Sequence, residues 1–254
     1  MRSRDISSAT HRFQAVTITP TTAALGAWGF GSLTWNDGEH AVRSPLSART
    51  GPPALTTPAE VTDVRASGAG SKVFSVLSTY TGPLRIVPVG LVPATRVADA
   101  VAQGDASRCY PLDVPAGAHV VRIALFDTDV ATPGADLTLQ LFKGATHNAV
   151  ATAFGGGRHA TIVALPPGRF TACVVGRTFP SSAAVPFTLS AWIVGPATGA
   201  QSLRATGPAS LTLGRQASIG LSWSVAAGRP YRGNVQFRGA GGAVVGSTIV
   251  SVNN

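Results

Sequence analysis

Hydrophobic and polar residues alternate with a period of two along most of this chain, in short runs separated by turns rich in glycine, proline and serine. Such alternation is typical of β-strands that bury one face. Only Ala94–Val101 has a spacing that fits a helical turn. The predicted strands are Phe13–Thr19, Ser32–Trp35, His40–Ser44, Lys72–Tyr80, Leu84–Val89, His119–Phe126, Asp136–Phe142, Thr161–Leu165, Phe170–Val175, Val185–Val194, Ala217–Val225, Gly233–Phe237 and Val244–Val252.

Strands that recur about every 8–12 residues with turn signals between them indicate antiparallel β-sandwiches rather than alternating strands and helices. Two adjacent prolines favour an extended linker at residues 50–58, and a second boundary falls near Gly195–Gly199. The sequence therefore predicts an all-β protein with segments at 1–49, 59–195 and 196–254. The first segment has too few strands to bury both faces of a sheet, so we expect an incomplete domain there.

Composition agrees with this fold class. The 254 residues include 29 glycines and 18 prolines but only two lysines and two glutamates, and 12% of the residues are charged. Strong helix formers are therefore scarce, and the low charge excludes a charge-rich disordered tail or a coiled coil.

The net charge of +9 raises the question of a nucleic-acid partner. The basic residues lie singly along the chain instead of forming a run, which argues against such a partner. No apolar stretch has the length of a membrane-spanning helix, so we expect no membrane span. The first ten residues are basic but lack a following apolar region, and they predict no secretory signal in this chain.

The two cysteines, Cys109 and Cys173, lie in or beside predicted strands and are too few for a zinc site. A disulfide between them is the preferred interpretation, and it would place the protein outside the cytoplasm. The alternative is two buried free thiols, which pack as small apolar side chains.

Residues 31–45 predict a hairpin in which Asn36, Asp37 and Gly38 supply a tight turn and Pro45 ends the pairing. Glycine suits the turn because it accepts a positive φ at little steric cost. We expect Trp35, Val42 and Leu33 to point inward.

The same stretch resembles the closing hairpin of the fibronectin type III-like domain that follows the catalytic domain of subtilisin-like serine peptidases. It contains every fixed position of the pattern Gly-Ser-Leu-x-Trp-x-Asp-Gly-x-His-x-Val-Arg-Ser-Pro. The family residues in this hairpin are Trp35, Asp37, Gly38, His40, Arg43, Ser44 and Pro45.

Later motifs are similar to other parts of the C-terminal extensions of these secreted bacterial enzymes. Residues 110–117, 125–129, 135–139 and 165–176 resemble a pre-peptidase C-terminal sandwich, and residues 208–252 resemble a last small sandwich. The resemblance implies tandem fibronectin type III-like or immunoglobulin-like and jelly-roll-like sandwiches. It also implies an extracellular parent whose upstream catalytic domain is missing here, with a cell surface or a polymeric substrate as a further partner.

The chain lacks the motifs that would support independent catalysis. No Gly-Thr-Ser or Gly-x-Ser-x-Gly nucleophile turn occurs, and the two glutamates, Glu39 and Glu60, have no paired-carboxylate spacing. We therefore expect no catalytic residues, and a reading frame that begins partway through the fibronectin type III-like domain. His40 belongs to the family hairpin, where a structural role is expected.

Calcium is the one ligand with some support in the sequence. Asp127, Asp129 and Asp136 flank a turn, and several carboxylates at one place suit a Ca²⁺ ion. Related domains have a further aspartate where this chain has Thr138, which weakens the site. The alternative is that these side chains cap turns.

The aromatic residues suggest an alternative function as an adhesion or carbohydrate-binding module. Trp35, Trp192 and Trp223 occupy alternating strand positions, where burial in the core is expected. Trp28 and Phe30 lie beside glycines and are the pair most expected to be exposed.

Overall fold

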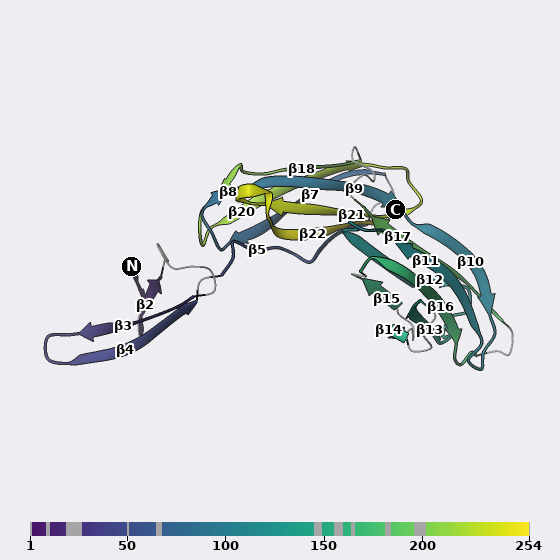
Figure 1. Cartoon of the computed structure of the whole chain (residues 1–254), viewed down its shortest axis with the longest axis horizontal. Coiled ribbons are helices and arrows are strands. Elements are labelled where there is room, and N and C mark those ends of the chain that lie inside the picture. Colours follow the sequence, from purple (N-terminus) through teal and green to yellow (C-terminus); the bar gives the residue numbers. More distant parts are fainter. Residues whose placement is uncertain are drawn as a thin grey trace. The chain divides into compact units, whose positions relative to one another are not determined.

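The structure is a computed structural model that describes residues 2–8, 11–18, 27–49, 51–64, 68–144, 149–154, 160–163, 166–180, 184–195 and 202–253. These residues form β-strands and one short 3-10 turn, Ala240–Gly242 (Figure 1). They belong to two compact units, Met1–Ala54 and Leu55–Asn254. The prediction of an all-β fold with multiple antiparallel sheets is confirmed. No helix in the described ranges is long and apolar enough to cross a membrane.

The first unit contains two antiparallel pairs of strands. β1 (Arg2–Ser8) pairs with β2 (His11–Thr17), and β3 (Trp28–Asn36) pairs with β4 (Ala41–Arg49). The predicted strands of this region agree with these elements except at two ends, because Ile18 and His40 lie just outside β2 and β4, and Thr19 lies outside the described residues.

The second unit contains a sandwich that we call the split sandwich, because residues 55–93 and 203–253 build it together. One sheet has the order β18-β20-β7-β5, the other has the order β6-β22-β21-β9, and β19 pairs with β8 at one end. Its core contains Val76, Ile219, Val235 and Phe237. The strands are β5 (Leu55–Thr56), β6 (Glu60–Val64), β7 (Ala69–Ser78), β8 (Gly82–Pro83), β9 (Arg85–Pro93), β18 (Leu203–Thr206), β19 (Ser210–Leu211), β20 (Gln216–Ser224), β21 (Pro230–Arg238) and β22 (Val244–Asn253).

Residues 95–194 form the inserted sandwich between β9 and β18. Its two four-stranded sheets have the orders β10-β17-β12-β15 and β11-β16-β13-β14. The core contains Ile123, Leu139, Leu141 and Val174, all fully buried. The strands are β10 (Thr95–Val101), β11 (Ser107–Val114), β12 (Val120–Val130), β13 (Leu137–Lys143), β14 (Ala149–Phe154), β15 (Ala160–Val163), β16 (Gly168–Gly176) and β17 (Val185–Val194).

This pairing differs from the expected boundaries at 59–195 and 196–254. β6 pairs in parallel with β22, and β9 pairs with β21, so strands at both ends of the second unit share one sheet. The expected linker at 50–58 is also too long, because Leu55 pairs with Ser78 and is buried. Alternation within a strand identifies its buried face but not its partner, and these partners are far apart in sequence.

The expectation of a helical turn at Ala94–Val101 is wrong, because this stretch is strand β10. It pairs with β17 from Thr95↔Ala191 to Val101↔Val185. Val97 and Val101 are four residues apart, and residues with that separation share a face in a strand as well as in a helix. The spacing alone could therefore not distinguish the two structures.

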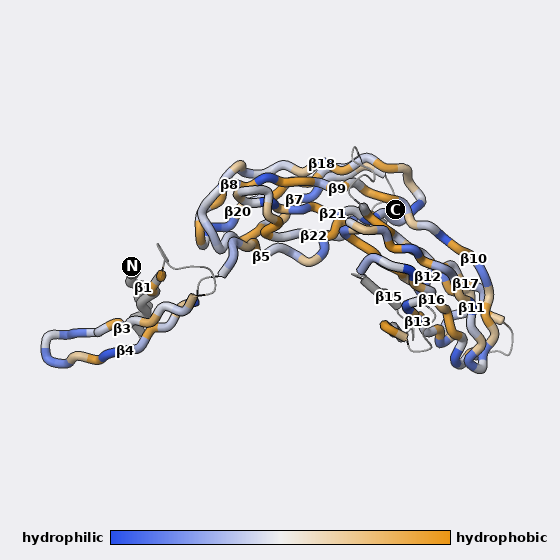
Figure 2. The backbone as a smooth tube through the Cα atoms, viewed as in Figure 1, coloured by the Kyte–Doolittle hydropathy of each residue, from blue (hydrophilic) through white to orange (hydrophobic). Residues whose placement is uncertain are grey.

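Apolar side chains join the split and inserted sandwiches. Val89 of the split sandwich packs with Val120 and Val194 of the inserted one, and Val92 of the split sandwich packs against the cluster that contains Trp192 and Ala124. Figure 2 shows hydrophobic and hydrophilic positions interspersed along the strands of both sandwiches. Hydrogen bonds add to the contact, because the Trp192 indole N–H donates to the Pro230 carbonyl over 3.1 Å.

A charged cluster lies at the same junction. Glu60 of β6 accepts hydrogen bonds from Arg122 of β12 at 2.9 and 3.1 Å, and it also accepts one from the Ser251 hydroxyl. The guanidinium of Arg232, a residue only 2% exposed, lies 4.7 Å from the centre of the Trp192 ring. The two sandwiches therefore share a network of ionic and cation–π contacts, in which Arg122 and Arg232 are buried and Glu60 is partly exposed.

Candidate functional site

The hairpin of the first unit has a turn built by the residues of the family pattern. One carboxylate oxygen of Asp37 accepts hydrogen bonds from the backbone N–H groups of Glu39 and His40, at 3.0 and 2.6 Å. Its other carboxylate oxygen lies 3.2 Å from Nδ1 of His40. The hydrogen bond from the His40 N–H, followed by that from Glu39, holds the pKa of Asp37 below its usual value. Gly38 has a φ of 100°, a backbone conformation that favours glycine.

The strands beside this turn carry the remaining pattern residues. Trp35 donates its indole N–H to the Ser44 hydroxyl over 3.2 Å. Arg43 lies opposite Thr34, and Pro45 lies opposite Ser32. The described contact of the His40 ring is with the Asp37 carboxylate, within the hairpin turn itself.

The expectation that Trp35, Val42 and Leu33 point into a core is wrong for the first two. Trp35 is 36% exposed and Val42 is 60% exposed, while Leu33 is half-buried. The three side chains do share one face of the hairpin with Leu46, as the cross-strand register requires. β3 and β4 form a two-stranded sheet in the described part of the chain, and the exposure of Trp35 and Val42 shows that no described residue buries this end of its apolar face.

The opposite face of the hairpin carries an exposed aromatic pair. Trp28 and Phe30 are 58% and 81% exposed, and their rings stack with centroids 6.2 Å apart at an interplanar angle of 13°. The expectations for Trp192 and Trp223 also agree with the structure, because both are buried.

The structure joins Cys109 and Cys173 by a disulfide, the pairing preferred from the sequence. The two residues lie opposite each other on β11 and β16, neighbouring strands of one sheet, with Cα atoms 4.0 Å apart. The bond therefore fixes the register of an edge strand instead of joining the two sheets.

We predict that replacing both cysteines, Cys109→Ser with Cys173→Ala, lowers the free energy of unfolding by about 2 kcal/mol, because the unfolded chain loses a cross-link. Urea denaturation measures this change, and Ser107→Ala on the same edge strand is the control. The mass of the wild-type chain, measured by mass spectrometry, should increase by two hydrogen atoms when reductant is added. Equal masses would contradict the bridge.

The structure does not bring the three candidate calcium ligands together. No group of three or more acidic, histidine or cysteine side chains in the described residues could hold a metal ion. Asp129 instead forms an ion pair with Arg96. The backbone of Asp136 bonds with Thr178 and Arg177 near the end of the sandwich. The expectation of a calcium site formed by Asp127, Asp129 and Asp136 is therefore corrected.

The histidines with described hydrogen bonds make no catalytic pair. His40 contacts Asp37, and His119 contacts Gln236 across the sandwich junction at 2.9 Å. His147 and His159 lie outside the described residues.

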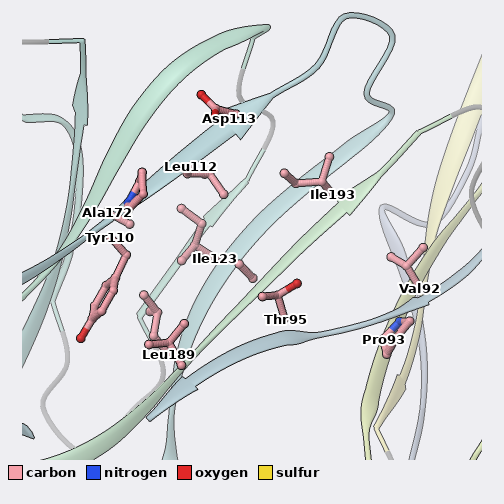
Figure 3. A pocket seen from close by; sticks show the side chains of 13 residues that line it. Val92, Pro93, Thr95, Tyr110, Leu112, Asp113, Ile123, Ala172, Leu189 and Ile193 are labelled. Carbon is pink, nitrogen blue, oxygen red and sulfur yellow. The ribbon is translucent and has the colours of Figure 1, made fainter. Parts of the chain in front are cut away.

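A pocket of about 390 Å³ opens on the inserted sandwich, and the sequence analysis did not identify it. Leu112, Ile123 and Leu189 line it from both sheets, and Val92 lines it from the end of β9 (Figure 3). Val97 of β10 also belongs to the lining. Each of these residues fits an ordinary strand alternation. The strand pattern therefore does not predict a pocket at this position.

Comparison with known proteins gives limited information. No protein-family model and no curated protein matches the chain. Among solved structures, the chain is similar to the pre-peptidase C-terminal domain of a collagenase from Bacillus anthracis. The two are 19% identical, the match covers 39% of this chain and 90% of that domain, and the TM-score is 0.31. This similarity assigns no activity to the chain.

Proposed function

We propose that this chain is a non-catalytic accessory region of a secreted subtilisin-like serine endopeptidase. It would stabilise the catalytic domain, control substrate access or tether the enzyme to a surface or polymer. The observation that carries the proposal is the hairpin of residues 31–45, because it has every fixed position of the family pattern.

The contacts of the hairpin support this interpretation. Asp37 and His40 pair at the turn, Gly38 takes the positive φ, and Trp35 bonds with Ser44. The pattern therefore corresponds to one compact turn and its first cross-strand pairs. A random match of isolated letters would not be expected to form such mutual contacts.

The exposed apolar face supports a partner for the hairpin. Trp35 and Val42 form a cross-strand pair at its outer end, and both are exposed. Aromatic and aliphatic side chains that share a strand face are typical of surfaces that become buried. The proposed partner is a preceding domain of the same parent enzyme. The disulfide agrees with an extracellular parent, since such bonds persist in oxidising compartments.

The first test reads the genomic DNA upstream of this chain in all three frames. We expect a subtilisin-like catalytic domain with a Gly-Thr-Ser nucleophile turn within a few hundred codons. Stop codons in every frame together with a separate promoter would contradict the proposal.

The second test adds the full chain to that catalytic domain and measures the half-life of its activity on fluorescent casein at elevated temperature. We expect the wild-type chain to extend the half-life and the Trp35→Ser/Val42→Ser variant to lose the effect. Thr34→Ser on the other hairpin face is the control. An equal effect of all three chains would contradict a role for the apolar face.

The Trp28 and Phe30 pair favours a second candidate function, an adhesion or carbohydrate-binding module. Exposed, stacked aromatic rings offer a flat apolar surface on which sugar rings can lie. On this hypothesis, Trp28→Ala/Phe30→Ala abolishes retention of the chain on insoluble polysaccharides such as cellulose and chitin, with no change in its thermal unfolding. Val42→Ala, on the opposite face, is the control. Equal retention of the variant and the wild type would reject this candidate.

A further inference from the structure

The pocket of the inserted sandwich lies between the edge strands of its two sheets. β10 ends one sheet and β11 ends the other. Thr95 and Val97 of β10 line the pocket together with Tyr110 and Leu112 of β11. Tyr110 and Leu112 are only half-buried although they face the interior, which is consistent with an opening on this side.

The interior of the pocket is apolar. Figure 3 shows the side chains of Leu112, Ile123 and Leu189 between the strands, while the polar ends of Tyr110 and Asp113 point away from them. The Tyr110 hydroxyl donates to an Asp99 carboxylate oxygen over 2.7 Å, and Asp113 pairs with Arg169 at 3.4 Å. The charged groups near the pocket therefore have partners outside it, and an uncharged apolar group is the chemistry that it fits.

The free edge of β10 supplies polar groups beside this apolar space. The N–H and the C=O of Ala100 bond with the side chains of Asp99 and Arg108, so both groups point away from β17. In an antiparallel edge strand, alternate residues direct both backbone groups to the same side. The backbone groups of Ala98 and Arg96 therefore also face the free edge, and no partner for them is found among the described residues.

The edge of β11 differs from that of β10. Pro111 lies in the middle of β11 and has no N–H, which makes this edge a poor template for another strand. β10 contains no proline. An added strand would therefore extend the sheet at β10, where its inward side chains would enter the pocket.

We propose that the inserted sandwich binds an extended peptide segment, which pairs with the free edge of β10 and places an apolar side chain in the pocket. Backbone hydrogen bonds would give affinity, and the pocket would select the side chain. A small apolar molecule could fill the pocket but would leave the Ala98 edge unpaired. The proposal does not depend on the proposed function.

A second copy of this chain fits the edge less well than a peptide of simple alternating sequence. If two β10 strands paired around Ala98, Val97 and Asp99 of one copy would point toward the pocket of the other. The Asp99 carboxylate of each copy, which accepts a hydrogen bond from its own Tyr110, would then lie beside the apolar pocket lining of the other copy at a free-energy cost. The occupant is therefore a segment whose alternate residues are all uncharged.

The test titrates the full-length, ¹⁵N-labelled chain with a heptapeptide whose ends are acetylated and amidated. Threonine alternates in this peptide with valine or leucine, and the central residue is leucine. Binding is followed by NMR. We expect the amide signals of Arg96 and Ala98 to shift in a saturable way. Replacing the central leucine with aspartate should weaken binding at least about tenfold. N-methylation of alternate peptide amides should also weaken it, because it removes the donors that a neighbouring strand needs.

Two variants of the chain test the edge and the pocket separately. Ala98→Pro removes an outward N–H without removing a bond to β17, so it should fold and lose peptide binding, while Ala98→Val should retain it. Ala191→Leu enlarges a side chain that lines the pocket and should weaken binding of the leucine peptide by about tenfold. The N-methylated peptide keeps the edge testable if Ala98→Pro fails to fold.

Several results would overturn the proposal. The first is no binding of the leucine peptide at millimolar concentration. The second is that the aspartate or the N-methylated peptide binds as tightly as the leucine peptide. The third is that a folded Ala98→Pro variant binds the leucine peptide as tightly as the wild type does. Sedimentation that shows a wild-type dimer, an Ala98→Pro monomer and no peptide binding would assign the edge to a second copy instead.

Discussion

Glu60→Gln is expected to lower the free energy of unfolding of the second unit by about 3 kcal/mol. Glu60 is the carboxylate that bonds with Arg122 and Ser251 at the junction of the two sandwiches. The substitution keeps the size of the side chain but leaves Arg122 and Arg232 near each other without the negative charge. Both arginines are buried, at 8% and 2% exposed, whereas the Glu60 side chain is 32% exposed, so water can compensate only part of the lost charge.

The same cluster predicts how stability depends on pH. Burial alone would raise the pKa of Glu60, but the Ser251 hydrogen bond and the charges of Arg122 and Arg232 lower it below the usual 4.5. A carboxyl group with a lowered pKa in the folded state stabilises the fold above its unfolded pKa. This contribution should therefore be lost as the pH falls below 4.5 and through the folded-state pKa of Glu60, and Glu60→Gln should lack this part of the acid dependence.

Urea denaturation followed by circular dichroism measures both effects on the full chain. Glu39→Gln, in the exposed hairpin turn, is the control and should change the free energy of unfolding by less than about 0.5 kcal/mol. The double variant Glu60→Gln/Arg122→Met should recover part of the loss, because it no longer buries an unpaired Arg122. If Glu60→Gln and Glu39→Gln had equal effects, the cluster would contribute little to the junction.

The sequence was sufficient to predict the class of the fold because sandwich strands have a local signal. Val185–Val194 begins with apolar and polar residues in alternation and lies in β17, and the short, largely apolar run Phe170–Val175 lies in β16. The Asn36-Asp37-Gly38 turn was also predictable, because its side chains bond with their own backbone neighbours. Interactions between residues that are close in sequence can be predicted from the residue types of that short segment.

The partners of the strands could not be predicted in the same way. β6 pairs with β22 although almost the whole second unit separates them in sequence. Glu60 likewise contacts Arg122 and Ser251, which are 62 and 191 residues away in sequence. The residue pattern of 59–64 is the same as that of a strand that pairs with a strand close to it in sequence, so it does not predict the distant partner.

The exposure of the hairpin shows a different limit. The alternation correctly placed Leu33, Trp35 and Val42 on one face, but a shared face is not a buried one. Burial depends on a second layer, and the sequence pattern of two strands does not contain that layer. The pocket was missed for a related reason, since its lining residues are ordinary inward positions of β10, β12 and β17.

Trp192→Ala is expected to lower the free energy of unfolding by about 4 kcal/mol, the range typical of removing a buried tryptophan. Trp192 is 1% exposed and belongs to the inserted sandwich, yet its indole N–H bonds with Pro230 of the split sandwich. Its ring also contacts Phe126 edge-on and lies under the guanidinium of Arg232. Alanine would leave a cavity and a buried cation without its aromatic partner, while the Pro230 carbonyl would keep only its hydrogen bond from the Ala94 N–H.

Trp192→Phe separates these contributions, because it retains an aromatic ring near Arg232 but removes the donor to Pro230. It should cost less than Trp192→Ala, and the part due to the lost hydrogen bond should be about 1 kcal/mol. Trp28→Ala removes the same atoms from a site that is 58% exposed and should change the free energy of unfolding by less than about 0.5 kcal/mol. Circular dichroism in urea measures all three. A different result would contradict this prediction: Trp192→Ala leaves the main urea transition unchanged, but small-angle scattering shows a larger radius of gyration. The two sandwiches would then be independently stable domains that the indole only holds together.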